Sequence, residues 1–158
     1  MAKTKKSPVF LKPPSLNSLV TNSQRSINIS LPSAKEVVSF LIQKTDTNEI
    51  AIHFVGKQKI AQLHAQYFHD PTPTDCITFP YEDPNFLGEV YVCPKVAEEY
   101  VKSHGGDVGE EITLYIVHGF LHLLGYEDTT PQSMKEMRTQ EKKRLSTLAK
   151  NKLGVKIS

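Results

Sequence analysis

The sequence has no tryptophan and only two cysteines, Cys76 and Cys93, which form no Cys-x-x-Cys arrangement. We therefore expect two free thiols in a reducing cytosol, with a disulfide or a cysteine ligand as the less favoured alternative. Long hydrophobic runs are also absent, because none approaches the ~18 apolar residues that a membrane span needs. No apolar run follows the lysines near the N-terminus, so we expect no secretory signal and a cytoplasmic location.

Acidic residues are missing from residues 1–30, which carry a net charge of +5. Residues 31–134 carry −9 and residues 135–158 carry +6, so an acidic body lies between two basic ends. Basic ends of this kind fit contact with a polyanion such as RNA. They are equally typical of a solubilising surface, and the charge pattern alone does not separate the two interpretations.

What the chain does contain is enough for one globular domain. Of its 158 residues, 39% are hydrophobic and 23% are charged, which allows a real hydrophobic core and excludes wholesale disorder. Residues 1–26 are rich in Ser, Pro, Lys and Asn without sustained periodicity, so we predict a flexible basic N-terminal extension there. The domain itself is expected over residues 27–158.

Hydrophobic periodicity predicts about four strands and five helices in mixed order. The strands are expected over residues 27–31, 49–55, 75–79 and 86–92, the third of them stopped by Pro80. The helices are expected over about residues 34–44, 57–68, 95–104, 108–125 and from 131 onward. This order predicts a single α+β domain in which a small, mostly four-stranded sheet is covered by about five helices.

The most specific signal is the spacing of His118, His122, Gly125 and Asp128. The two histidines lie four residues apart in an apolar, helix-like segment, so their imidazoles share one face of the helix. Gly125 can end that helix in the left-handed conformation, after which the chain can bring Asp128 to the same ion. Three protein ligands with one open position are typical of a catalytic metal site, whereas a structural zinc site usually has four. The spacing therefore predicts a metal site at the end of a central helix.

The same spacing occurs in metzincin proteases, but those enzymes carry a glutamate directly after the first histidine. Here the residue is Gly119, so the general base of zinc proteolysis is missing and peptidase chemistry is disfavoured. Glycine inside a helix costs about 1 kcal/mol relative to alanine. Gly119 therefore has a compensating role, which is either room for a substrate beside the metal or close packing against a neighbouring element.

Three segments of the chain carry the motifs of a known family. The segment at 118–128 reads H-G-F-L-H-L-L-G-Y-E-D, and those at 73–80 and 87–93 read P-T-D-C-I-T-F-P and L-G-E-V-Y-V-C. They resemble, in turn, the H-G-x-L-H-L-x-G-Y-D-H, P-T-D-V-L-S-F-P and L-G-D-I-x-I motifs of the YbeY family of bacterial endoribonucleases, also called rRNA maturation factors. The resemblance covers about residues 27–150 and leaves the N-terminal extension outside.

This resemblance implies a zinc-dependent, single-strand-specific endoribonuclease. Its implied roles are maturation of the 3′ end of 16S rRNA and late quality control of the 70S ribosome, with ribosomal subunits and ribosomal proteins as partners. By the same likeness, His118 and His122 match the first two metal ligands, and Asp128 occupies the position of the third.

Three residues depart from the family pattern: Asp128 stands where histidine is usual, Phe68 where arginine is common, and Glu89 where aspartate is usual. The carboxylate of Asp128 lowers the net charge of the site, which makes harder metals such as manganese an alternative to zinc. An arginine at position 68 could hold the scissile phosphate. Phe68 therefore favours an alternative function, a metal-stabilised ribosome assembly or RNA-binding factor with weak or no cleavage activity.

The residue that transfers protons is not evident from the sequence, because Gly119 supplies no base. Glu127, Glu111 and Glu89 are candidates by their position in or near the motifs, although exposed glutamates are usually solvated surface. The nucleophile is either a water activated by the metal or the 2′-hydroxyl of the RNA itself.

Overall fold

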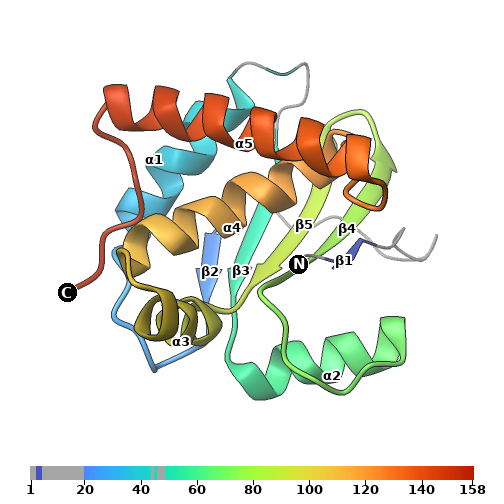
Figure 1. The fold of residues 1–158 in the computed structure, drawn as a ribbon, viewed down its shortest axis with the longest axis vertical. Helices are drawn as coiled ribbons and strands as arrows, with labels where there is room; N and C mark the ends of the chain where they lie inside the picture. Colours follow the sequence, from blue (N-terminus) through green and yellow to red (C-terminus); the bar gives the residue numbers. More distant parts are fainter. Residues whose placement is uncertain (1–2, 5–19, 44, 46–48) are drawn as a thin grey trace.

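The computed structural model describes residues 3–4, 20–43, 45 and 49–158. Among these residues, five strands form one sheet in the order β1-β4-β5-β3-β2 (Figure 1). They are β1 (Lys3–Thr4), β2 (Val20–Asn22), β3 (Ala51–Phe54), β4 (Cys76–Asp83) and β5 (Phe86–Val92). The β4–β5 pair is antiparallel, and every other neighbouring pair is parallel. The predicted small sheet is confirmed, with the two residues of β1 added at one edge.

Five helices in the described part of the chain surround this sheet. They are α1 (Leu31–Ile42), α2 (Lys57–Phe68), α3 (Pro94–His104), α4 (Val108–Leu123) and α5 (Pro131–Lys150). Helix α4 lies across the sheet and is crossed by α5, while α2 lies apart from both of them (Figure 1). The predicted α+β class, with one sheet and five helices, is confirmed.

Alternation along the strands gives each face of the sheet its own apolar layer. Val90 and Val92 of β5 belong to the main core together with α1, α4 and α5. Ile77 and Phe79 of β4 belong to a second cluster together with α2. Helix α4, which carries the histidine pair, and helix α2 therefore lie on opposite faces of the sheet.

The central helix α4 is buried along most of its length, and from Ile112 to Leu123 only Leu114 is partly exposed. Gly119 faces β5, where an added Cβ atom would lie 2.5 Å from Cγ1 of Val90. A separation below 3 Å is too short for two carbon atoms without a shift of the neighbour. Close packing of the helix on the sheet is therefore the reason for Gly119.

The strand predicted over residues 27–31 is wrong. In this segment Ile29 makes only an isolated bridge to Ile157. Ser30 accepts a hydrogen bond from the backbone amide of Ser33 and caps α1, so the helix begins directly after it. The strand that pairs with β3 at this edge is β2, which lies earlier in the chain.

The strand predicted to stop at Pro80 continues to Asp83. Pro80 lies opposite Gly88, next to a register shift in the β4–β5 pair. A proline has no amide hydrogen to donate, and an irregularity of this kind is where a sheet tolerates that loss.

Residues 1–2 and 5–19, which make up most of the predicted flexible extension, lie outside the described residues. The domain boundary predicted at residue 27 therefore stays a prediction. In the part of the chain that the structure describes, no helix is long and apolar enough to cross a membrane.

Replacing Gly119 with alanine should lower the free energy of unfolding by about 1–3 kcal/mol, because overpacking against Val90 outweighs the better helix propensity of alanine. Urea denaturation of Gly119→Ala measures this cost. In a Val90→Ala background the same substitution should cost much less, since its clash partner is gone. Equal costs in the two backgrounds would contradict the proposed packing.

Candidate metal centre

The chain reverses direction directly after α4. Gly125 has a φ of +102°, which side chains other than hydrogen rarely allow. The amide of Tyr126 donates a hydrogen bond to the carbonyl of Leu121 across this turn, at 3.0 Å. The turn expected at Gly125 is therefore present, and it brings Asp128 back beside the last turns of the helix.

The side chains of His118, His122 and Asp128 converge on one point. The two imidazole Nε2 atoms lie 3.1 Å apart. Oδ2 of Asp128 lies 3.4 Å from Nε2 of His118 and 3.6 Å from Nε2 of His122. Both histidines are buried and the Asp128 side chain is 20% exposed, so the group opens to solvent through the carboxylate.

The other ring nitrogen of each histidine is held by a hydrogen-bond acceptor. Nδ1 of His118 lies 2.5 Å from Oε2 of Glu141, and Nδ1 of His122 lies 3.0 Å from the carbonyl oxygen of Tyr126. Because a carboxylate and a carbonyl only accept, each Nδ1 carries the proton and donates it. Each Nε2 then presents a lone pair. Two lone pairs and one carboxylate oxygen face each other, an arrangement that can hold a cation between them.

The donor atoms fit a metal ion in both type and spacing. Two imidazole nitrogens and one carboxylate oxygen are the ligand set of many catalytic zinc sites. Ligands about 2.1 Å from a tetrahedral ion lie about 3.4 Å apart, and the observed separations run from 3.1 to 3.6 Å. The group can therefore close around one ion with little movement.

The surroundings favour the neutral form of His122. Burial lowers the pKa of His122, the neighbouring His118 lowers it further, and Asp128 offsets part of that shift. A metal binds only the neutral imidazole, so a lowered pKa reduces the competition from protons.

Glu141 was not among the residues that sequence reasoning selected. It lies in α5, is only 7% exposed, and reaches His118 across 23 residues of sequence. The available signal was its place in the apolar stripe of that helix, four residues after Met137 and four before Leu145. A carboxylate on a buried helix face requires a partner, and here the partner is an imidazole.

Among the three candidate glutamates, only Glu111 lies on the helix that carries the histidines. It precedes His118 by seven residues, which is two helical turns, so the two side chains point to the same side of α4. Burial raises the pKa of Glu111, a hydrogen bond with Tyr115 opposes this, and the nearby charge of Asp75 raises it again.

Glu89 lies on the opposite face of the sheet. Its neighbour Val90 packs against α4, and alternate residues of a strand point to opposite faces. The Glu89 carboxylate lies 2.9 Å from Nε2 of His53 and accepts a hydrogen bond from the Tyr81 hydroxyl at 2.7 Å. Burial would raise the pKa of Glu89, but these two hydrogen bonds outweigh it and the pKa is lowered.

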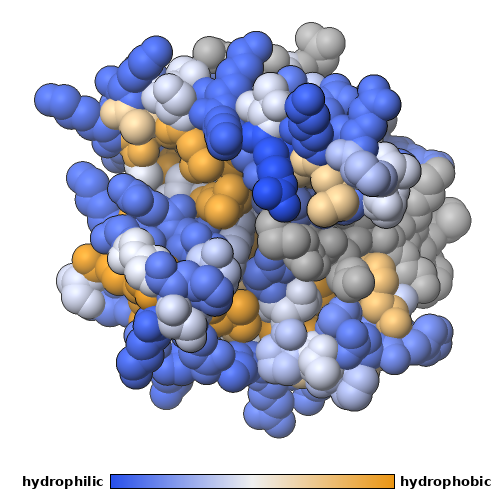
Figure 2. Space-filling view, in the orientation of Figure 1, coloured by the Kyte–Doolittle hydropathy of each residue, from blue (hydrophilic) through white to orange (hydrophobic). Residues whose placement is uncertain are grey.

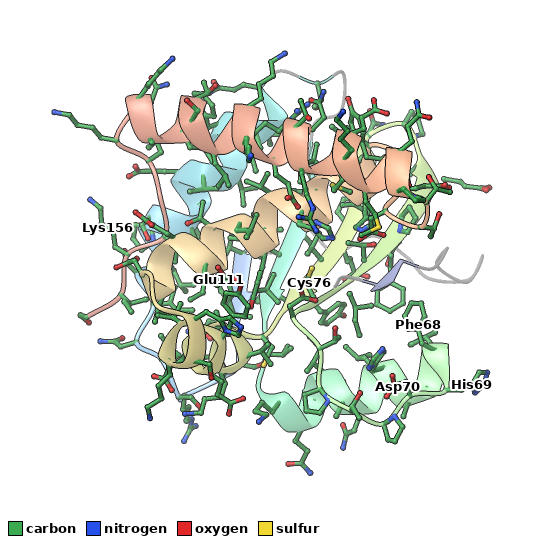
Figure 3. All side chains as sticks on the ribbon, in the orientation of Figure 1. Phe68, His69, Asp70, Cys76, Glu111 and Lys156 are labelled. Carbon is green, nitrogen blue, oxygen red and sulfur yellow. The ribbon has the colours of Figure 1, made fainter. Side chains whose placement is uncertain are left out.

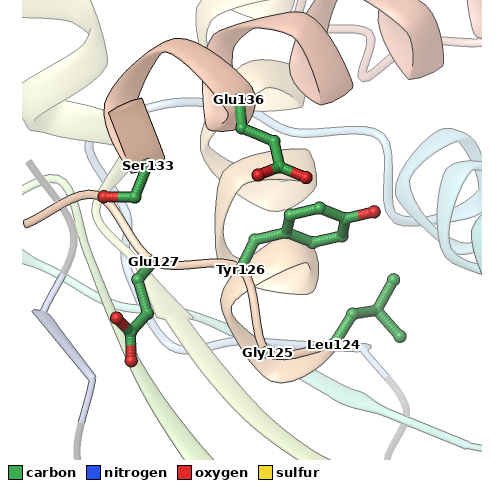
Figure 4. Close-up of a pocket in the computed structure, with 6 residues that line it drawn as sticks. All are labelled: Leu124, Gly125, Tyr126, Glu127, Ser133 and Glu136. Atoms are coloured by element: carbon green, nitrogen blue, oxygen red, sulfur yellow. The ribbon is translucent and has the colours of Figure 1, made fainter. Parts of the chain in front are cut away.

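Glu127 is exposed and turns toward a separate hollow beyond the end of α4. That hollow, of about 410 Å³, is lined by Glu127 together with residues of the helix end and of α5 (Figure 4): Leu124, Gly125, Tyr126, Ser133 and Glu136. The structure thus places the three glutamates in three different surroundings and does not bring them together.

Phe68 ends α2 and packs against the second apolar cluster. Its ring centre lies 5.9 Å from that of His64. Figure 3 shows Phe68, His69 and Asp70 grouped at this end of α2, well apart from Glu111 on α4. An aromatic ring at this position serves packing and offers no charge to a phosphate.

The contact with His118 makes a specific prediction for Glu141. Glu141→Gln keeps the shape of the side chain but removes the charge that holds the Nδ1 proton, so metal affinity should fall about 10–100-fold. Competition with a chromophoric chelator measures the affinity, and circular dichroism checks the fold. Glu136→Gln, an exposed position on the same helix, is the matched control. Equal affinities for the two variants would contradict this role.

Comparison with known proteins agrees with the motifs. The family model described as "Endoribonuclease YbeY" matches residues 19–149. An "Endoribonuclease YbeY" of Protochlamydia amoebophila is 42% identical over 143 residues, covering 86% of this chain and 95% of the relative. One of Chlamydia caviae is 36% identical, covering 87% of this chain and 94% of the relative.

A solved structure supports the same fold. The solution structure of TM1509 from Thermotoga maritima matches with a TM-score of 0.59 and 26% identity, covering 80% of this chain and 85% of that one. The family model spans most of the chain, and the curated relatives exceed 30% identity over most of their own length. The resemblance seen in the three motifs is thereby confirmed, and the chain belongs to the YbeY endoribonuclease family.

Proposed function

We propose that this protein is a metal-dependent endoribonuclease that cleaves single-stranded RNA at the centre formed by His118, His122 and Asp128. The observation that carries the proposal is the convergence of two imidazole lone pairs and one carboxylate oxygen within 3.6 Å of one another. Family membership supports an RNA substrate and an endonuclease reaction.

Zinc is the ion that we propose for the site. Two nitrogens and one carboxylate oxygen suit zinc at a catalytic centre. The carboxylate of Asp128 also suits manganese, which prefers oxygen ligands more than zinc does. When bound, either ion supplies Lewis acidity for phosphodiester cleavage.

The chain's own residues hold the site ready for that chemistry. Glu141 and the Tyr126 carbonyl keep the proton on Nδ1 of each histidine, so both Nε2 atoms stay available. Asp128 supplies a negative charge at the solvent side of the group. For proton transfer, Glu111 shares the helix side of His118 but lies about 10 Å away along the helix. Any proton that it transfers would therefore pass through water.

For the biological substrate we propose 16S rRNA, with roles in maturation of its 3′ end and in quality control of the 70S ribosome. This assignment rests on the family resemblance and implies a cytoplasmic protein that meets ribosomal subunits and proteins. The basic ends of the chain, +5 over residues 1–30 and +6 over residues 135–158, suit contact with such a polyanion.

One observation favours a second function, that of a metal-stabilised assembly factor with little cleavage activity. Phe68 is built into an apolar cluster, at a position where the motif resemblance implies an arginine. Single-turnover cleavage of single-stranded RNA at high protein concentration separates the two functions. Cleavage that a chelator abolishes supports the nuclease, whereas chelator-sensitive RNA binding without cleavage supports the assembly factor.

Removing a ligand should remove both metal and activity. We expect His122→Ala and Asp128→Ala each to lower the bound metal far below one ion per chain and to reduce RNA cleavage by ~100-fold or more, since even the partners of ligands contribute 10–100-fold. Elemental analysis and cleavage of a labelled RNA measure the two effects. Glu136→Ala serves as the exposed acidic control. Full activity in both ligand variants would refute the proposed centre.

A further inference from the structure

A groove leads away from the metal centre between α3 and α5. It has a volume of about 430 Å³, and His118 and Asp128 form part of its lining. Leu114 of α4 and Met137 of α5 add an apolar floor. Figure 2 shows hydrophobic side chains in the hollow between these helices, on an otherwise mostly hydrophilic face. A ligand in the groove would therefore touch both the metal ligands and an apolar surface.

The rim of this groove exposes large hydrophobic side chains. Tyr100 of α3 is 45% exposed and Met134 of α5 is 41% exposed. Among the described residues only one other large hydrophobic side chain is exposed, Ile157 at 39%. Exposed hydrophobic side chains gathered at one place mark a binding surface more often than chance.

The ring of Tyr100 is held in place by stacking on a neighbouring ring. It stacks on His104 with ring centres 4.1 Å apart and an angle of 11° between the planes. Nδ1 of His104 lies 3.0 Å from the carbonyl oxygen of Tyr100, which fixes the second ring against the helix. A fixed aromatic ring is a suitable surface for stacking an unpaired base.

Two cations complete the rim. Arg138 and Lys142 lie one turn apart on α5, line the groove and are exposed. Neither has an ion pair with another described residue. Positive charge here offsets the carboxylates of Asp128 and Glu141, which would otherwise repel a phosphate. Cations beside an aromatic surface are the usual combination in sites for single-stranded nucleic acid.

We propose that this groove binds the nucleotides of single-stranded RNA next to the scissile phosphate. A base lies against Tyr100 and Met134, and Arg138 and Lys142 hold backbone phosphates. A duplex would not fit, because its bases are stacked inside and offer no free face. The proposal deepens the proposed nuclease function and rests on it, since it assigns the groove to the substrate of the same centre.

The test compares Tyr100→Ala and the double variant Arg138→Ala/Lys142→Ala with a matched control, Lys135→Ala/Lys143→Ala. The control removes two exposed lysines of the same helix that do not line the groove. The probe is a short fluorescein-labelled single-stranded RNA. Stopped-flow anisotropy reads its affinity before cleavage proceeds, and elemental analysis verifies that each variant keeps its metal.

We expect each groove variant to weaken RNA binding about tenfold and raise KM, with bound metal unchanged. Losing two phosphate contacts should also reduce the slope of log affinity against log salt by about 1.4. The control pair should change neither affinity nor slope appreciably. Equal losses of RNA affinity in the control pair and the groove pair would show a nonspecific electrostatic attraction and overturn the proposal. Unchanged RNA binding in both groove variants would overturn it as well.

The outcomes separate this proposal from the nuclease function. If the wild-type protein cleaves RNA and the groove variants bind RNA normally, only the proposed role of the groove is overturned. If the groove variants lose RNA binding and the wild-type protein does not cleave RNA, the proposed nuclease function is overturned. The groove then remains an RNA-binding site.

Discussion

The structure around the histidine pair depends on one electrostatic constraint. Nδ1 of His118 and Nδ1 of His122 both donate to acceptors, so their Nε2 lone pairs meet 3.1 Å apart with Asp128 beside them. Lone pairs at that distance repel unless a positive charge lies between them. Burial of both imidazoles strengthens that requirement, because water cannot fully screen the contact. The three side chains thus form a group that can hold a cation.

Two features of the fold hold these side chains in position. Helix α4 lies close on the sheet because Gly119 offers no side chain to Val90. Helix α5 crosses α4 and places Glu141 beside Nδ1 of His118. The same crossing leaves a groove between α3 and α5 that is lined by His118 and Asp128. The packing of the sheet, the contact between Glu141 and His118 and the lining of the groove therefore all depend on α4 and α5.

The sequence predicted the elements that depend on the spacing of nearby residues. The helix over residues 57–68, the strand over residues 86–92 and the turn at Gly125 appear as expected, because periodicity and glycine chemistry act within a few residues. The strand over residues 27–31 failed, since the capping chemistry of Ser30 prevailed over a short alternation. Glu141 was missed because its role arises only from tertiary packing across 23 residues, although its place in an apolar stripe was visible.

We infer that one cation joins the two histidines and the aspartate. Anomalous diffraction from crystals of the purified protein, collected at the absorption edge of the metal found in it, tests this claim most directly. We expect a single strong peak about 2.1 Å from Nε2 of His118, Nε2 of His122 and a carboxylate oxygen of Asp128. A metal peak elsewhere in the chain, with these three side chains turned apart, would contradict the account.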